Sequence, residues 1–158
     1  MFKMKTTLQL LAMALLLGIS CSRNKPIEVY QQFDNQSWHR YRTLKFEIPL
    51  NTSGNSYDIM IFAHLTKDFS YETLDFNMVM NTPSGEERIK EYQLKIKSFT
   101  GSFLGKCDQD SCIYSMPLKK GIIIAEPGIL KIELENLTPR IETTGILGIG
   151  IRLLEAVD

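Results

Sequence analysis

Tyr57-Asp58-Ile59-Met60-Ile61-Phe62-Ala63 is the stretch that most clearly indicates the fold class of this 158-residue chain. Apolar and polar residues alternate with period two, which is typical of a strand with one buried face. The same alternation recurs over residues 44–48 and 74–80. Residues 51–55 and 81–85 follow two of these segments and are rich in Asn, Ser, Gly and Pro, as turns require. The pattern predicts a series of half-buried strands.

Working outward, shorter or less regular segments extend the strand pattern along the rest of the chain. They cover residues 88–97, 113–116, 122–125, 129–135 and 146–154. The first is interrupted at Glu91 and Tyr92, where a β-bulge would restore one apolar face. In the last, Gly148 and Gly150 leave one face without side chains, so another backbone or sheet can approach closely.

Eight or nine short strands without an amphipathic helix between them predict two sheets packed face to face. The expected fold is all-β, a single antiparallel β-sandwich over residues 27–158. Jelly-roll and immunoglobulin-like strand orders both fit the spacing, so the topology stays open.

The N-terminus predicts a lipoprotein signal peptide over residues 1–20. Lys3 and Lys5 precede an apolar run at residues 8–17, and Gly18-Ile19-Ser20 leads to Cys21. The run is shorter than the roughly 20 residues that a membrane helix needs. Cleavage before Cys21 would make it the lipidation site, with residues 21–26 as a lipidated tether, and two or more acyl chains hold a protein stably at a membrane. The alternative is an ordinary signal that leaves Cys21 free or paired.

Charge and composition narrow the class of partner. Residues 21–158 carry 16 Lys and Arg against 18 Asp and Glu, a formal charge of about −2, which argues against nucleic acid because phosphate binding needs a concentrated basic face. Many lipoproteins that are exported to the cell surface carry acidic residues directly after the lipidated cysteine. No acidic run follows Cys21, so we expect the anchored domain to face the periplasm. With two histidines, His39 and His64, we expect neither a metal site nor a cofactor.

Cys107 and Cys112 are predicted to form a small disulfide across a loop, since a secreted chain enters an oxidising compartment. A metal or redox pair is the alternative, but no second cysteine pair or nearby histidine completes a zinc set. Asp108 and Asp110 between them lack the glycine and distal Glu of an EF-hand loop, so a solvated turn is expected.

The candidate binding surface is a set of aromatic residues in the predicted loops. Its members are Trp38, Tyr41, Phe69, Tyr71 and Phe103, with Phe99 nearby. Aromatic loops on a rigid sandwich can form a recognition surface. The alternative is that these residues cap the ends of the core. Neither histidine lies in a catalytic motif, so no catalytic residues are assigned and a non-enzymatic protein is expected.

Several short motifs resemble those of the gliding-motility lipoprotein GldH family of Bacteroidota. They are Val29-Tyr30 with Trp38, residues 64–74 around Asp68-Phe69-Ser70-Tyr71-Glu72-Thr73-Leu74, Thr82-Pro83-Ser84-Gly85, Gly101-Ser102-Phe103-Leu104-Gly105-Lys106, residues 126–132, and residues 145–152. The chain departs from the family at Phe103, where Trp is usual, at residues 136–140 in place of a Met-Arg pair, and near Glu91, where an Asp-Thr element is absent.

The resemblance implies a non-enzymatic lipoprotein of the cell envelope. Its expected role is accessory to gliding motility and the associated type IX secretion machinery, through contacts with other envelope proteins. Relatives also occur in bacteria that do not glide, so the resemblance does not imply motility of the host. A carbohydrate-binding lipoprotein with a glycan ligand is the alternative function, and a hydrolase that uses paired carboxylates is a third.

Overall fold

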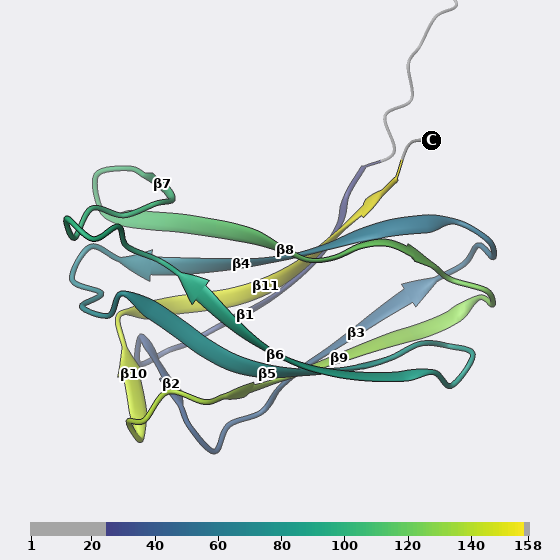
Figure 1. The fold of residues 1–158 in the computed structure, drawn as a ribbon, viewed down its shortest axis with the longest axis horizontal. Helices are drawn as coiled ribbons and strands as arrows, with labels where there is room; N and C mark the ends of the chain where they lie inside the picture. Colours follow the sequence, from purple (N-terminus) through teal and green to yellow (C-terminus); the bar gives the residue numbers. More distant parts are fainter. Residues whose placement is uncertain (1–24, 157–158) are drawn as a thin grey trace, which may run out of the picture.

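The computed structural model describes residues 25–156 as an antiparallel β-sandwich (Figure 1). The predicted signal peptide and Cys21 lie outside this range. The strands in chain order are β1 (Ile27–Gln32), β2 (Ser37–His39), β3 (Leu44–Leu50), β4 (Ser56–Thr66), β5 (Thr73–Asn81), β6 (Glu87–Lys95), β7 (Lys106–Cys107), β8 (Ser111–Ile123), β9 (Gly128–Asn136), β10 (Glu142–Thr144) and β11 (Ile146–Glu155). The predicted all-β antiparallel fold is confirmed.

Two sheets form the layers of the sandwich. The first has the strand order β1-β11-β4-β8-β7 and the second the order β3-β9-β5-β6, while β10 and β2 form a separate pair at one end (Figure 1). All of these pairings are antiparallel. The sequence left the strand order open; the chain crosses between the layers at residues 51–55, 67–72 and 124–127, among others.

The period-two pattern places one side of each long strand in the core. Along β4 every second residue is buried, including Ile59, Ile61 and Leu65, which are fully inaccessible. On the facing sheet, Leu130, Ile132 and Leu134 of β9 are equally buried. Each such side chain contributes about 1.5–3 kcal/mol relative to an exposed one. The alternation read from the sequence therefore describes the main source of stability.

Two predicted details of the strands are wrong. Residues 113–116 and 122–125 are not separate strands, because residues 111–123 form one strand, β8, with register shifts opposite Ile59. The expected bulge at Glu91 and Tyr92 is absent, since β6 pairs with β5 in unbroken register. Ile89 is consequently exposed, and β6 keeps charged residues on its inner face.

Gly148 and Gly150 of β11 are covered by two aromatic rings, and the backbone of β1 also comes close at Gly148, where an added Cβ would lie 2.6 Å from the Gln31 carbonyl oxygen. Tyr30 on β1 and Phe62 on β4 both lie opposite Gly150 in register. Their rings are nearly parallel, with centroids 5.8 Å apart. A Cβ added at Gly150 would overlap the Phe62 ring, and one added at Gly148 would overlap the Tyr30 hydroxyl. The glycines therefore let two rings lie against the sheet.

The sandwich has two different ends (Figure 1). At one, which we call the proximal end, β1 begins and β11 ends side by side, as Ile27 pairs with Leu153. At the opposite, distal end lie the β2–β10 pair, β7, and the loops that follow β4 and β6. The aromatic residues of the candidate binding surface all belong to the distal end.

Candidate functional site

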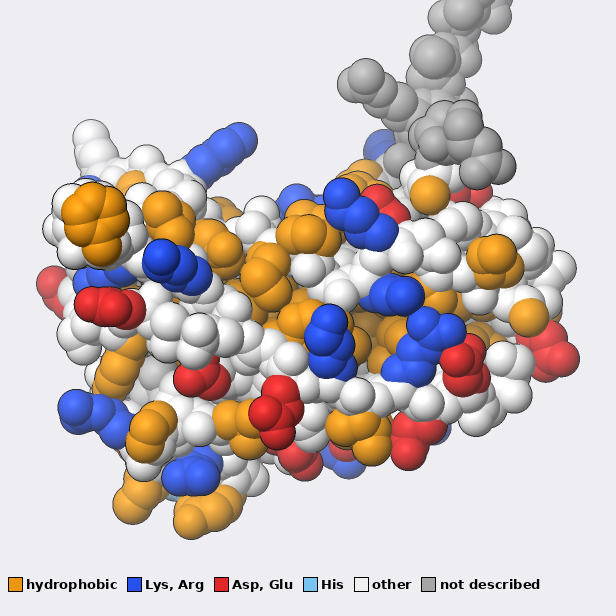
Figure 2. Space-filling model, in the orientation of Figure 1, with side chains coloured by type: hydrophobic (Ala, Val, Ile, Leu, Met, Phe, Trp, Pro, Cys, Tyr) orange, Lys and Arg blue, Asp and Glu red, His pale blue; other side chains and the backbone are white. Residues whose placement is uncertain are grey.

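The distal end exposes an unusual number of large apolar side chains. Tyr41 is 81% exposed, Phe99 94%, Ile141 64% and Leu104 50%. Apolar side chains are visible at both corners of this end in Figure 2. Exposed aromatic and aliphatic residues on loops can form protein contact sites. We call these four residues the distal loop surface.

Tyr41 is held at the tip of a hydrogen-bonded turn. The backbone N–H of Arg42 donates to the carbonyl of His39 at 2.9 Å, and the N–H of Tyr41 donates to His39 Nδ1 at 3.2 Å. The indole N–H of Trp38 donates to the carbonyl of Arg42 at 2.8 Å. The turn is thus fixed from beneath by a buried residue, so the backbone that presents Tyr41 is already ordered before binding.

Phe99 occupies an equivalent position in the loop after β6. The N–H of Gly101 donates to the carbonyl of Ser98 at 3.0 Å, which closes a tight turn around Phe99. Gly101 has a φ of 81°, in the left-handed region that favours glycine. The hydroxyls of Ser98 and Thr100 lie 2.7 Å apart and add a second tie across the turn. Two rigid turns therefore display two aromatic rings.

The remaining predicted aromatics, Tyr71 and Phe103, are partly buried and carry cations on their rings. Lys97 Nζ lies 4.8 Å from the centroid of Phe103, and the guanidinium of Arg140 lies 5.5 Å from that of Tyr71. Such contacts contribute about 0.5–1 kcal/mol at exposed sites. They place a lysine and an arginine beside the aromatic rings of the distal end.

Trp38 and Phe69, two members of the candidate binding surface, do not belong to the distal loop surface. Both are fully buried. Trp38 lies on β2 against Phe33, with ring centroids 6.5 Å apart, and Phe69 packs edge-on against Tyr71 at 5.3 Å. These two residues cap the end of the core, which was the alternative reading of the aromatic set.

A buried polar network beneath the distal turns was missed by the sequence analysis. Asn136 Nδ2 donates to the carbonyl of Trp38 at 3.0 Å and to Thr143 Oγ1 at 3.1 Å. Its Oδ1 accepts the backbone N–H of Thr138 at 2.9 Å and the Thr138 hydroxyl at 2.6 Å. One buried amide thus joins β9, β2 and β10. The sequence signal that could have revealed the network is Asn136 itself, a polar residue that continues the buried alternation of Leu130, Ile132 and Leu134.

Cys107 and Cys112 are joined by a disulfide at the β7–β8 turn. Within this turn the Asp108 carboxylate accepts the backbone N–H groups of Asp110 at 2.9 Å and Ser111 at 2.8 Å. These hydrogen bonds, of which the one from Asp110 has the largest effect, hold the pKa of the Asp108 carboxyl below its ordinary value of 3.8. The turn is organised by its own side chain, as expected of a solvated turn.

His64 meets this turn through the hydroxyl of Ser111. His64 Nε2 lies 2.8 Å from Ser111 Oγ, which donates to Asp108 Oδ1 at 3.2 Å. A nucleophilic triad needs the histidine between the serine and the carboxylate, so that it can accept the serine proton. Here the serine lies between the histidine and the carboxylate. The chain of hydrogen bonds fixes the turn and lacks the order that activates a serine.

The side chain of His39, the second histidine, lies in the turn at Tyr41, and the centroids of the His39 and Tyr41 rings are 5.6 Å apart. Among residues 25–156, no three His, Cys, Asp or Glu side chains are placed to share a metal ion. The same range contains no helix of the length and hydropathy needed to cross a bilayer.

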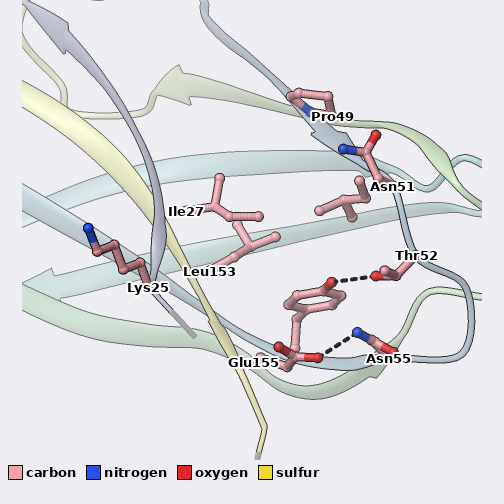
Figure 3. A pocket seen from close by; sticks show the side chains of 10 residues that line it. Lys25, Ile27, Pro49, Asn51, Thr52, Asn55, Leu153 and Glu155 are labelled. Atoms are coloured by element: carbon pink, nitrogen blue, oxygen red, sulfur yellow. Dashed lines mark hydrogen bonds between the residues drawn. The ribbon is translucent and has the colours of Figure 1, made fainter. Parts of the chain in front are cut away.

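A shallow pocket of about 380 Å³ lies at the proximal end (Figure 3). Ile27 and Leu153 form an apolar side, while Asn51, Thr52 and Asn55 supply polar groups. The Tyr57 hydroxyl lies 3.2 Å from Thr52 Oγ1, so part of the polar lining is already internally bonded. The pocket lies beside Lys25, where the described chain begins.

Comparisons with solved structures give only distant likenesses. Tripeptidyl peptidase 2 is 11% identical with a TM-score of 0.46, and the match covers 82% of this chain and 10% of that protein. AlgX of Pseudomonas aeruginosa is 14% identical with a TM-score of 0.42 over 87% of this chain and 28% of that protein. Latent PorU of Porphyromonas gingivalis is 10% identical with a TM-score of 0.35 over 87% of this chain and 14% of that protein. We draw nothing from TM-scores this low. A search of curated proteins finds no match.

The fold and the distal loop surface define the class as a single antiparallel β-sandwich whose candidate site is a contact surface built from loops. The family model described as GldH lipoprotein matches residues 26–153. The chain therefore belongs to the GldH lipoprotein family, and the predicted resemblance is confirmed. Membership of a lipoprotein family supports a membrane-anchored protein of the cell envelope.

Proposed function

We propose that this protein is a non-catalytic, lipid-anchored accessory component of the gliding-motility and type IX secretion machinery. It contacts other envelope proteins through the distal loop surface. The observation that carries the proposal is the family match over residues 26–153 together with the exposed side chains of Tyr41 and Phe99 on rigid turns. In this arrangement Cys21 carries the lipid, the domain faces the periplasm, and the distal end points away from the membrane.

The anchor and its orientation are tested in cells. We expect incorporation of labelled palmitate and membrane fractionation of the wild type, and loss of both in Cys21→Ala. Proteinase K added to intact cells should leave the domain uncut, while lysed cells should lose it. Cleavage in intact cells would place the domain on the cell surface and contradict the periplasmic orientation.

The contact surface is tested by cross-linking in cells, affinity purification and mass spectrometry. Tyr41→Ser with Phe99→Ser should remove envelope proteins that the wild type captures. Ile123→Ser is the matched control, because Ile123 is 67% exposed on β8 and is not part of the distal loop surface. Equal loss of partners in both variants, or in neither, would argue against the distal loop surface.

A second candidate function, glycan binding, is favoured by the outer face of the first sheet. The nearly parallel rings of Tyr30 and Phe62 lie on this face, with the Arg152 guanidinium 5.3 Å from the Phe62 centroid and 2.6 Å from a Glu28 oxygen. Aromatic faces flanked by polar groups can pack on sugar rings. Glycan-array binding that is lost in Tyr30→Ala and kept in Tyr41→Ser would support this function over the first.

A further inference from the structure

The side of the sandwich between β6 and β8 is lined by two sheet edges. Within residues 25–156, β6 pairs with β5 alone, and β8 beyond Ile113 pairs with β4 alone. Figure 2 shows a hollow on this face, with an apolar floor and several Lys and Arg side chains around it. At its base the Tyr92 hydroxyl donates to the carbonyl of Leu118 at 2.7 Å and joins the two edges. We call this region the basic groove.

Strand parity separates the charges of β6 onto opposite faces. Arg88, Lys90 and Tyr92 pair with the buried residues Met80, Met78 and Phe76, so their side chains leave the sheet on its inner side. Glu87, Glu91 and Lys95 have the opposite parity and lie on the outer face. The inner side of this edge therefore carries basic residues and no acidic one.

The facing edge adds a second basic residue over an apolar base. On β8, Met116 pairs with buried Ile61, which directs it toward the inner side. Lys119 lies opposite Ile59 at the register shift of β8, next to buried Leu118. Lys119 is exposed, whereas Met116 is half-buried and Leu118 is buried. Each edge thus carries one exposed lysine close in sequence to apolar side chains of the inner side.

These two lysines have no carboxylate partner within the described part of the chain. Arg88 is engaged by Glu86 at 2.7 Å. Lys90 instead lies over the Tyr92 ring, with Nζ 4.9 Å from its centroid, and Lys119 takes part in no ion pair. Burial raises the pKa of the Tyr92 hydroxyl, which marks the base of the groove as poorly solvated. Unpaired cations beside apolar surface favour an anionic ligand with an apolar side.

We propose that the basic groove binds an acidic segment of a partner protein in extended conformation. The walls are strand edges, whose outward N–H and C=O groups an extended polypeptide can pair with. Alternating acidic and apolar side chains would then reach the lysines and the floor. Pro117 interrupts the donors of β8, so the charged contacts supply most of the selectivity. The site is separate from the distal loop surface and does not rest on that part of the proposed function.

The test uses the full chain in detergent and fluorescence anisotropy. The probe is a labelled ten-residue peptide in which Glu alternates with Val and Thr, and the same peptide with Gln for Glu is its control. We expect saturable binding of the acidic peptide that weakens with salt. Lys90→Glu and Lys119→Glu should each weaken it about tenfold or more. Lys95→Glu, which makes the same charge change on the outer face of β6, should change it less than about twofold.

Four results would overturn the proposal. Equal loss in Lys95→Glu would indicate a general charge effect, and equal binding of the Gln peptide would remove the role of charge. Binding of phosphatidylglycerol vesicles or of an oligouronate through the same lysines, without binding of the peptide, would assign the groove to lipid or polysaccharide. Self-association of Lys90→Glu in light scattering, again without peptide binding, would show that the lysines only protect the sheet edge. Circular dichroism verifies that each variant is folded.

Discussion

Trp38 and Tyr41 are three residues apart at the distal end, yet one is fully buried and the other is 81% exposed. Phe69 and Phe99, in the loops after β4 and β6, differ in the same way. The buried pair forms an inner layer, and the exposed pair belongs to the distal loop surface. Residue type therefore does not decide the role of an aromatic residue in these loops. Its position in the turn does, because Tyr41 and Phe99 occupy the tips of hydrogen-bonded turns.

The two layers have different physical tasks. The inner layer is held by packing and by the buried bonds of Asn136, which connect Trp38 with Thr143. In the outer layer, Tyr41 is displayed by the inner layer through the bond from Trp38 to Arg42, whereas Phe99 is displayed by the bonds of its own turn. Substitutions in the first should therefore reduce the free energy of unfolding, and those in the second should leave it nearly unchanged.

The largest effect is expected for Trp38→Ala. Removal of a buried indole leaves a cavity and frees the carbonyl of Arg42, so the free energy of unfolding should fall by about 3–5 kcal/mol. Urea denaturation of the full chain measures this loss. Trp38→Phe should lose less, because most of the volume is kept. A loss below about 1 kcal/mol in Trp38→Ala would contradict a structural inner layer.

Asn136→Ala should have the next largest effect. It leaves the Thr143 and Thr138 hydroxyls and the Trp38 carbonyl short of a partner in a buried site, which costs about 1–3 kcal/mol. Asn51→Ala removes the same amide from an exposed loop and should stay within about 0.5 kcal/mol. Equal denaturation midpoints for the two variants would show that the network does not support the turns.

Tyr41→Ser combined with Phe99→Ser should change the free energy of unfolding by less than about 1 kcal/mol, since each exposed substitution stays within about 0.5 kcal/mol. The same double variant is expected to lose its partners in cells. Thermal unfolding followed by circular dichroism separates the two effects. A large stability loss would mean that the exposed rings also support the fold, and the division into layers would fail.

The smallest effect concerns the Asp108 turn and depends on pH. Because the folded state lowers the pKa of this carboxyl, the turn is stabilised above the ordinary value of 3.8 and loses that stabilisation as the pH falls through the folded value. Amide exchange of Asp110 and Ser111 should accelerate there relative to the rest of β8. Asp108→Asn should abolish this pH dependence, while Asp110→Asn should keep it.

Periodicity predicted most of the sandwich because its strands have one buried face. The segments that correspond to β3, β4, β5, β9 and β11 were identified from alternation alone. β6 was not read correctly, since the basic residues Arg88 and Lys90 occupy inner positions at a sheet edge where water still reaches them. Alternation assumes that an inner residue is apolar, and this assumption fails at an edge.

The candidate surface could be predicted only in part. Of the predicted aromatic set, Tyr41 is exposed and Trp38 and Phe69 are buried. The sequence could not separate them, because loop residues have no period that relates sequence to burial. Their depth depends on tertiary contacts such as the bond from Trp38 to Arg42. The Asn136 network was missed for the same reason, since its partners lie on β2 and β10 and cannot be recognised locally.

The pairing of β1 with β11 has a consequence for when the domain can fold. Within the described chain β1 finds its strand partner at residues 148–153, the last long strand to be made. A chain that is exported N-terminus first must keep β1 unpaired until nearly all of it has emerged, and such distant pairings form slowly. An exposed edge invites aggregation during that interval. In the proposed periplasmic arrangement, we therefore expect the chain to depend on a chaperone until β11 arrives.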